Sequence, residues 1–225
     1  MLVLGIDSAG HACAACVWRD GEVLSVSEEP MERGQDARLV PLVLNVMAKA
    51  SVEFSQIDRF AATRGPGSFT GLRIGLAAAR GFGLATGKPV VGVDRFSIHK
   101  EQQKSRTEDV LAVLDSKRRE LFCRLYPARG IAGDAALLAP EEIAELVRGR
   151  SEVVICGDSN CILRPLLPDS ALFVETREPE VITCARLAFS ANLEDQDFLP
   201  RPLYLRAPDV TGPKSVRESL CVRTR

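Results

Sequence analysis

The chain contains almost no histidine, and this scarcity excludes several kinds of active site. Only two of its 225 residues are histidines, His11 and His99. A Ser-His-Asp triad needs histidine as the base, and many metal centres use imidazole ligands. Few such arrangements can be drawn with two histidines. The sequence therefore predicts no catalytic residue of its own and no metal site.

The chain also lacks a charge excess and a long apolar run. Its 29 Lys and Arg nearly balance its 30 Asp and Glu, so a protein that binds nucleic acid by phosphate neutralisation alone is disfavoured. The one basic segment, residues 201–225, has six Lys or Arg against two acids and is expected to be a solvated tail. No apolar run approaches the roughly 20 residues of a membrane span, and no signal-peptide pattern is present. We expect a cytoplasmic protein that makes no membrane contact and meets RNA only through a partner.

The seven cysteines do not form a disulfide framework or a clear metal motif. Their number is odd and they are scattered, which favours reduced thiols. Cys13 and Cys16 have the spacing of half a zinc site, but both lie in the strand-like run 12–18. Residues three apart on a strand point to opposite faces, so these thiols should not bind one ion together.

The most informative segment is Arg64-Gly65-Pro66-Gly67-Ser68-Phe69-Thr70-Gly71-Leu72-Arg73-Ile74-Gly75. It follows an apolar run, so it predicts a tight turn at a strand end, with Ser68 capping the next helix. Such a turn can hold an anion, and a stripe of small residues on the helix allows close approach of another backbone. The alternative is that these glycines only permit the helix to pack on the sheet. Neither the dinucleotide fingerprint nor the P-loop fits the glycine spacing, and Gly87 is expected to end the helix.

The first half of the chain predicts a sheet covered by helices. Strand patterns at 2–7, 12–18 and 23–27 are followed by a helix at 36–50, a strand at 57–63, the glycine-led helix and a strand at 90–93. This is the order of a ribonuclease-H-like domain. The helix at 36–50 carries an apolar arc wider than one core contact needs, which suggests a second packing surface. A helix sandwiched within one chain explains the arc equally well.

The second half predicts a reduced version of the first. A polar run at 100–109 separates two domains, 1–103 and 104–225. Beyond it, a hairpin is predicted from 110–114 and 120–126, a helix opens at Pro140 and ends at Gly149, and short strands follow at 153–156 and 171–174. The expected fold class is α/β, with two ribonuclease-H-like domains of which the second is smaller.

Four segments together resemble the bacterial TsaB (YeaZ) family over residues 1 to about 214. They are Leu4-Gly5-Ile6-Asp7-Ser8, the glycine segment, Leu114-Asp115-Ser116-Lys117-Arg118-Arg119-Glu120, and Pro202-Leu203-Tyr204-Leu205-Arg206-Ala207-Pro208-Asp209. The resemblance implies a two-domain actin-like (ASKHA) fold. It also implies an accessory, scaffold role in placing threonylcarbamoyl on N6 of adenosine 37 (t6A) in tRNAs that read codons beginning with A. The implied partners are the catalytic paralogue TsaD and the ATPase TsaE, which would bind the ATP and the metal ion.

The resemblance also carries implications for single residues. In the catalytic paralogue, two histidines four residues apart bind a metal soon after the strand that corresponds to 90–93; here Arg95 and His99 have that spacing. A guanidinium has no lone pair to donate and repels a cation, so no metal is expected, and His99 is expected at the surface or at a boundary. Asp7 is the candidate for contact with a nucleotide, if one binds. Its surroundings are incomplete, because the loop that follows has one glycine.

Two sets of site residues follow from this reading. We expect the helices at 36–50 and 68–86 to bind the catalytic paralogue, or a second copy when the chain is alone. The residues of this surface are Leu39, Leu42, Val43, Val46, Gly71, Gly75 and Ala78. We expect a loop that contacts a nucleotide or the ATPase partner to contain Asp7, Gly65, Gly67, Ser68 and Thr70. Asp115, Arg118, Arg119 and Glu120 are expected at a hairpin beside the inter-domain cleft. A structural salt bridge explains these four residues as well.

Two other function classes stay open at this point. One is an autonomous nucleotide-dependent or metal-dependent enzyme of the actin-like superfamily, either a transferase or a peptidase. The other is a tRNA-binding subunit that uses the basic tail together with Arg64, Arg73 and Arg80. The near-neutral charge argues against the second.

Overall fold

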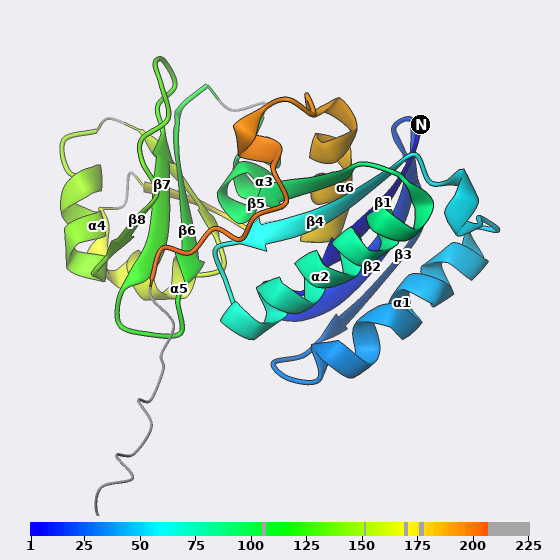
Figure 1. Ribbon diagram of the computed structural model, residues 1–225. Coiled ribbons are helices and arrows are strands. Elements are labelled where there is room, and N and C mark those ends of the chain that lie inside the picture. The colour runs from blue at the N-terminus through cyan, green and yellow to red at the C-terminus, as the bar shows by residue number, and fades with distance from the viewer. Residues whose placement is uncertain (105–106, 151, 169–170, 176–177, 207–225) are drawn as a thin grey trace, which may run out of the picture.

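Two five-stranded mixed sheets form the protein, which we describe from a computed structural model (Figure 1). The structure describes residues 1–104, 107–150, 152–168, 171–175 and 178–206. The first sheet contains β1 (Leu2–Asp7), β2 (Ala12–Arg19), β3 (Glu22–Pro30), β4 (Arg59–Gly65) and β5 (Val90–Asp94). The second contains β6 (Asp109–Asp115), β7 (Leu121–Tyr126), β8 (Ala136–Leu138), β9 (Val153–Gly157) and β10 (Ala171–Val174).

The two sheets have the same topology. Their spatial orders are β3-β2-β1-β4-β5 and β8-β7-β6-β9-β10. In each sheet the first three strands in chain order pair in antiparallel fashion, and the fourth and fifth run parallel to the strand that comes first in the chain, β1 or β6. This confirms the predicted ribonuclease-H-like order and the predicted likeness of the two halves. Asp20 and Gly21 both have positive φ at the first hairpin, as the Asp-Gly turn predicts.

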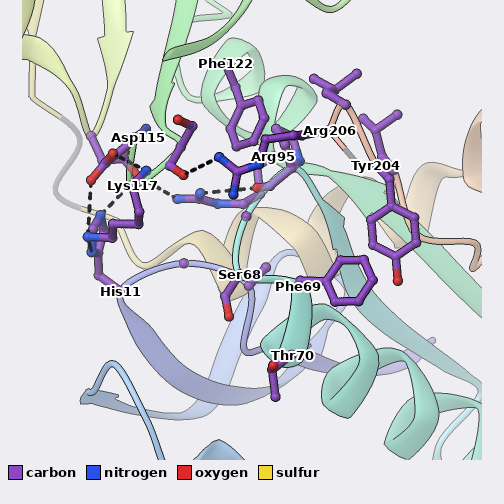
Figure 2. Close-up of a pocket in the computed structure, with 18 of the residues that line it drawn as sticks. His11, Ser68, Phe69, Thr70, Arg95, Asp115, Lys117, Phe122, Tyr204 and Arg206 are labelled. Carbon is purple, nitrogen blue, oxygen red and sulfur yellow. Dashed lines mark hydrogen bonds and ion pairs between the residues drawn. The ribbon is translucent and has the colours of Figure 1, made fainter. Parts of the chain in front are cut away.

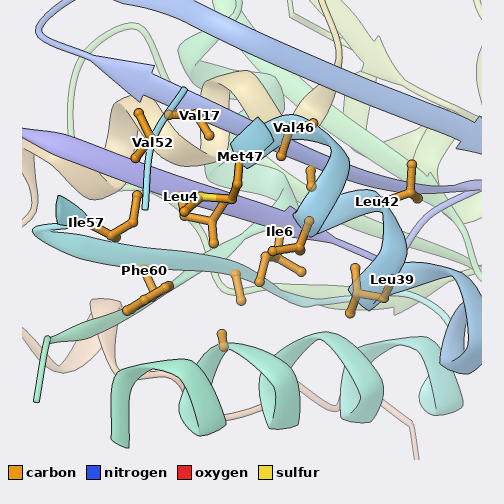
Figure 3. Close-up of a cluster of buried hydrophobic side chains, with 14 of the residues drawn as sticks. Leu4, Ile6, Val17, Leu39, Leu42, Val46, Met47, Val52, Ile57 and Phe60 are labelled. Carbon is orange, nitrogen blue, oxygen red and sulfur yellow. The ribbon is translucent and has the colours of Figure 1, made fainter. Parts of the chain in front are cut away.

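One face of the first sheet is covered by α1 (Gln35–Lys49) and α2 (Phe69–Thr86). Leu39, Leu42 and Val46 of α1 pack on Leu4 and Ile6 of β1 in one apolar core (Figure 3). Burial of these side chains stabilises the layer, since each fully buried Leu or Ile contributes about 1.5–3 kcal/mol. The apolar stripe of α1 therefore faces inward.

The start and end of α2 follow the sequence closely. Ser68 caps the helix, because its Oγ accepts a hydrogen bond from the N–H of Gly71 at 3.2 Å. Gly87 ends it in the left-handed conformation with φ 68°. Both features confirm the predicted helix boundaries.

The other face of the first sheet is covered by a helix that was not predicted. α6 (Glu180–Ser190) packs on β1, β2 and β4, beside the short α3 (Arg95–Glu101) (Figure 1). The predicted division into domains 1–103 and 104–225 assigns α6 to the second unit, whereas α6 packs on the sheet of the first unit. The physical reason is that this sheet is apolar on both faces, and α1 and α2 cover only one of them.

After α6, the chain crosses from the first unit to the second. η3 (Gln196–Phe198) contacts β5, and residues 199–206, which we call the strap, then run along the glycine loop. The N–H of Leu203 donates to the carbonyl of Arg64 at 2.6 Å. Leu203 and Leu205 pack into a core of the second unit, and Arg206 donates to the carbonyl of Ser116. The strap thus joins both units (Figure 1).

The second unit has smaller covering elements. They are α4 (Pro140–Val147), α5 (Asn160–Leu163) and η2 (Arg164–Leu166), while η1 (Phe54–Gln56) belongs to the first unit. The predicted helix from Pro140 and the predicted strands are confirmed, and Gly149 has a φ of 87° just after α4. Within the described residues, no helix combines the length and the apolar character that crossing a membrane requires. Most of the predicted basic tail, residues 207–225, lies outside the described residues.

Candidate functional site

A cavity of about 620 Å³ lies in the cleft between the two units (Figure 2). Loops at the ends of strands from both units form its wall, together with the strap. The lining residues most relevant to binding are His11, Ser68, Thr70, Lys117 and Arg206, with the rings of Phe69, Phe122 and Tyr204. Asp115 and Asp158 also line it, so the cavity has cationic, anionic, hydroxyl and aromatic surfaces.

The glycines of the predicted loop serve close packing of one backbone on another. A Cβ on Gly67 would lie 2.3 Å from the carbonyl oxygen of Ala9, and one on Gly71 would lie 1.9 Å from that of Ser8. Gly65 has a φ of 108° and faces the carbonyl of Leu203. This supports the packing alternative for the glycines. Ser68 and Thr70 are the exposed members of the set, and both line the cavity.

The floor of the cavity is a buried ion cluster centred on Arg95, the first residue of α3. Its guanidinium, only 2% exposed, donates to both carboxylate oxygens of Glu180, at 2.7 and 2.5 Å. The same group donates to Asp158 at 3.1 Å. Glu180 and Asp158 were not predicted as site residues, because they lie 85 and 63 positions away and no local pattern marks them. The acidic first turn of a helix, after Pro179, is the only sequence signal for Glu180.

His99 lies in this cluster, which corrects the expectation of a surface or boundary position. It is 4% exposed, and its Nε2 lies 3.2 Å from Oε1 of Glu180. His11 is paired in a similar way, with Nε2 at 3.3 Å from Oδ2 of Asp158. The hydrogen bond to Asp158 raises the pKa of His11 above its usual value. Both histidines of the chain thus belong to one cluster.

The carboxylates of the cluster are held ionised. Burial alone would raise the pKa of Glu180, but the charge of Arg95 holds it well below the usual range. The pKa of Asp158 is also lowered, because the hydrogen bond from His11 and the charge of Arg95 outweigh its burial. Both pKa values are lowered by ion pairing and hydrogen bonding, which outweigh the effect of burial.

Asp7, the predicted nucleotide contact, is buried behind this floor and does not line the cavity. Thr63 donates to its Oδ1 at 2.5 Å, and the N–H of Ala9 donates to the same atom at 2.9 Å. Burial, followed by the negative charge of Glu180, raises the pKa of Asp7 to about 6. The surroundings of Asp7 are therefore those of a buried structural residue and not of a ligand contact.

We expect Asp7→Asn to raise the free energy of unfolding at neutral pH. The folded chain binds the Asp7 proton more tightly than the unfolded chain, so stability falls as pH rises from about 4 to about 6 and then levels off. Asparagine keeps both accepted hydrogen bonds and removes this loss, which is worth up to about 3 kcal/mol. Urea unfolding at pH 4 and pH 7 measures the difference between variant and wild type, with exposed Asp36→Asn as control. A difference that does not change with pH would contradict the assignment.

The residues do not fit a divalent metal at the Arg95 position. Arg95 offers no lone pair, and its guanidinium already occupies the oxygens of both carboxylates. Cys13 and Cys16 lie in cores on opposite faces of the first sheet, as the strand geometry predicts. In the part of the chain that the structure describes, no three His, Cys, Asp or Glu are arranged to hold a metal ion.

The predicted partner-binding residues require a correction. The side chains of Leu39, Leu42, Val43 and Val46 are at most 1% exposed, and Gly71 and Gly75 are buried against the Ser8 loop. Ala78 is half-buried against the core of the first unit. Apart from Ala78, these residues have almost no exposed surface for a partner, because they pack in the core and against the loop after β1. The wide apolar arc of α1 divides into this core stripe and two exposed residues, Val40 and Leu44.

Of the four residues predicted beside the cleft, Asp115 lines the cavity, whereas Arg118, Arg119 and Glu120 do not. Ser116 and Lys117, which were not among those four, line it as well. Nζ of Lys117 lies 3.1 Å from Asp115 and 3.2 Å from Nδ1 of His11 (Figure 2). Lys117 was not predicted as a site residue. Its backbone φ of 59° lies in the left-handed region, which is uncommon for residues other than glycine.

Comparisons of sequence identify relatives of the chain. The family model described as TsaD, tRNA N6-adenosine threonylcarbamoyltransferase, matches residues 29–147. The tRNA threonylcarbamoyladenosine biosynthesis protein TsaB of Escherichia coli K12 is 33% identical over 128 residues, which cover 56% of this chain and 55% of that protein. An uncharacterized protein of Mycobacterium tuberculosis is 32% identical over 213 residues, or 92% of each chain. The match thus spans about half the length of the Escherichia coli protein and nearly all of the mycobacterial one.

Comparisons of structure agree with the topology. YeaZ from Pseudomonas aeruginosa superposes with a TM-score of 0.71 at 24% identity and covers 91% of this chain and 99% of its own. A ROK hexokinase from Thermus thermophilus gives 0.52 at 14% identity, with 84% and 99% covered. At these identities the likeness concerns the fold. It confirms the predicted actin-like arrangement of two ribonuclease-H-like units.

Proposed function

The chain belongs to the TsaB (YeaZ) family, and we propose that it is a non-catalytic accessory subunit in the synthesis of t6A at position 37 of tRNA. A TsaD-type paralogue carries out the transfer in this proposal, and a TsaE-type ATPase turns over ATP. Those partners bind the ATP and the metal ion, and tRNA is met only within the complex. The six cysteines of the described residues are free thiols, as expected for a protein that functions in the reducing cytoplasm.

The observation that carries the non-catalytic role is the filled floor of the cleft. Arg95 donates hydrogen bonds to the carboxylates of Glu180 and Asp158. The buried carboxylate of Asp7 accepts hydrogen bonds from Thr63 and from the N–H of Ala9. Asp158 lines the cavity, but its oxygens already accept hydrogen bonds from Arg95 and from the N–H of Asp115. A general base has to reach the proton that it removes, and these groups are already bonded.

We place the partner surface on the outward side of α1 and α2. It contains Val40 and Leu44 of α1, 44% and 53% exposed, and Leu84 of α2, 86% exposed. Ala77 and Gly81 are exposed on α2 as well. Exposed apolar side chains on two adjacent helices, together with exposed small residues on α2, suit a helical partner such as the TsaD-type paralogue or a second copy of this chain. Ser68 and Thr70 at the cavity wall are the proposed contacts of the TsaE-type ATPase.

We expect Leu44→Asp and Leu84→Asp each to weaken binding to the TsaD-type subunit at least about tenfold, which is about 1.4 kcal/mol. A buried aspartate has no partner in an apolar interface, whereas the free chain keeps both positions in water. Titration calorimetry measures the affinity, and Ile162→Asp on α5, an exposed apolar position outside the proposed surface, serves as control. Unchanged affinity for both variants and for their combination would place the interface elsewhere. Substitutions at Leu42 or Val46 are unsuitable, since they disrupt the core.

Reconstitution tests the proposed function as a whole. Purified TsaD-type and TsaE-type proteins are incubated with tRNA, ATP and the threonylcarbamoyl donor, with and without this chain, and t6A is measured by mass spectrometry of nucleosides. We expect product only when this chain is present, and none from this chain alone. Product from this chain alone would instead identify an autonomous transferase.

A further inference from the structure

We propose that the floor of the cleft is a guanidinium-binding site that is filled by the chain's own Arg95, and that this internal ion pair holds the two units together. Three separate parts of the chain meet at this side chain. Arg95 follows β5 in the first unit, Asp158 follows β9 in the second unit, and Glu180 begins α6. The site is therefore a junction and not a feature of one domain.

The acceptors around Arg95 match the shape of a planar guanidinium. Nε and Nη2 donate to the two oxygens of Glu180 in a fork, at 2.7 and 2.5 Å. Nη2 also donates to Oδ2 of Asp158 at 3.1 Å, and Nη1 donates to the carbonyl of Pro66 at 3.4 Å. Three nitrogens thus have acceptors in directions that a compact ammonium group cannot reach together.

The surroundings fit closely around the guanidinium. A Cβ on Gly10 would lie 3.1 Å from Nη2 of Arg95, so the loop after β1 packs directly on it. His11 and His99 contact the same carboxylate oxygens that Arg95 contacts, Oδ2 of Asp158 and Oε1 of Glu180 respectively. Asp158 is further fixed by the N–H of Asp115, at 2.6 Å from its Oδ1. Both carboxylates are thus held in position around one cation.

The charge balance explains why the site joins the units. With Arg95 present, one buried cation is shared by a carboxylate from α6 and a carboxylate from the second unit. Without it, these two carboxylates and Asp7 would form a buried group of negative charges with no central cation. Breaking a buried ion pair at one partner is strongly destabilising for this reason. The carboxylates would then be driven toward water, and the cleft would open.

Chemical rescue of Arg95→Ala tests the proposal. We expect this variant to melt about 10 °C below wild type. Low-millimolar guanidinium chloride should restore part of the loss with a saturable dependence on concentration, although guanidinium lowers the melting temperature of ordinary proteins. Matched sodium or magnesium chloride should not restore it, and wild type should show no rise. Arg95→Lys should retain a large part of the defect, since it keeps the charge and loses the fork.

Failure of guanidinium to raise the melting temperature of Arg95→Ala, or an equal rise with magnesium, would overturn the proposal. Should Arg95→Ala not fold, Asp158→Asn gives a second test, because it removes only the arm to the second unit. Hydrogen exchange of Asp158→Asn should then be faster at residues 115–117 and 66–70 and unchanged in β1 and α1. Unchanged exchange at the cleft would show that Arg95 does not hold the units together.

Discussion

Gly71→Ala lowers the free energy of unfolding by more than about 3 kcal/mol in our expectation, although alanine is the better helix former. The added Cβ would lie 1.9 Å from the carbonyl oxygen of Ser8, and Ser8 Oγ already donates to the carbonyl of Gly71 at 2.8 Å. Both contacts involve backbone, which cannot rotate away. The helix or the loop after β1 must move, and that loop forms part of the cavity wall. Urea unfolding followed by circular dichroism measures the loss.

Two other glycines of the same helix provide matched controls. Gly81 is exposed with no atom within 4 Å of an added Cβ, so Gly81→Ala should raise stability by about 0.5–1 kcal/mol. At Gly75 the added Cβ would meet the Ser8 hydroxyl at 2.6 Å, so the loss should be intermediate. The test is whether the free energy of unfolding decreases in the order Gly81→Ala, Gly75→Ala, Gly71→Ala. Equal effects at Gly71 and Gly81 would mean that the contact with Ser8 does not constrain α2.

Ala185→Glu should release α6 from the first unit and leave little folded protein. Ala185 is fully buried in the core that α6 forms with β1, β2 and β4, and its Cβ would lie 3.2 Å from one added to Gly5. A carboxylate there has no ion-pair partner, and burying it unpaired costs several kcal/mol. Limited proteolysis should cut the variant near residue 178, and its melting temperature should fall sharply.

Ser190→Glu is the matched control, because Ser190 is exposed at the end of the same helix. It should melt within a few degrees of wild type. If Ala185→Glu were as stable and as resistant to protease as Ser190→Glu, the assignment of α6 to the first unit would be wrong.

Local features of the fold were predictable from sequence because each rests on neighbouring residues. Strand alternation, the Asp20-Gly21 turn, the Ser68 cap and the Gly87 helix end depend on interactions within a few positions. The order of elements then led to the ribonuclease-H-like topology. The inward and outward sides of α1 were less predictable, since an arc of seven apolar residues does not show which five the sheet will bury.

The candidate site was harder to predict because its contacts are distant in sequence. The glycines marked the loop, but only the fold shows that Gly67 and Gly71 face Ala9 and Ser8. The spacing of Arg95 and His99 indicated a lost metal ligand, and nothing local indicated that Glu180 and Asp158 would pair with them. The sequence predicted a surface or boundary position for His99 for the same reason, because its partner Glu180 lies 81 residues away.

The late position of α6 has a consequence for synthesis on the ribosome. The strands of the first sheet are complete at residue 94, yet the part of one face that α6 covers stays exposed until residues 180–190 have emerged. At about 5–20 residues per second, this interval lasts several seconds or more. The nascent first half therefore presents an apolar face throughout this time, and we expect it to be a substrate for chaperones that bind translating chains.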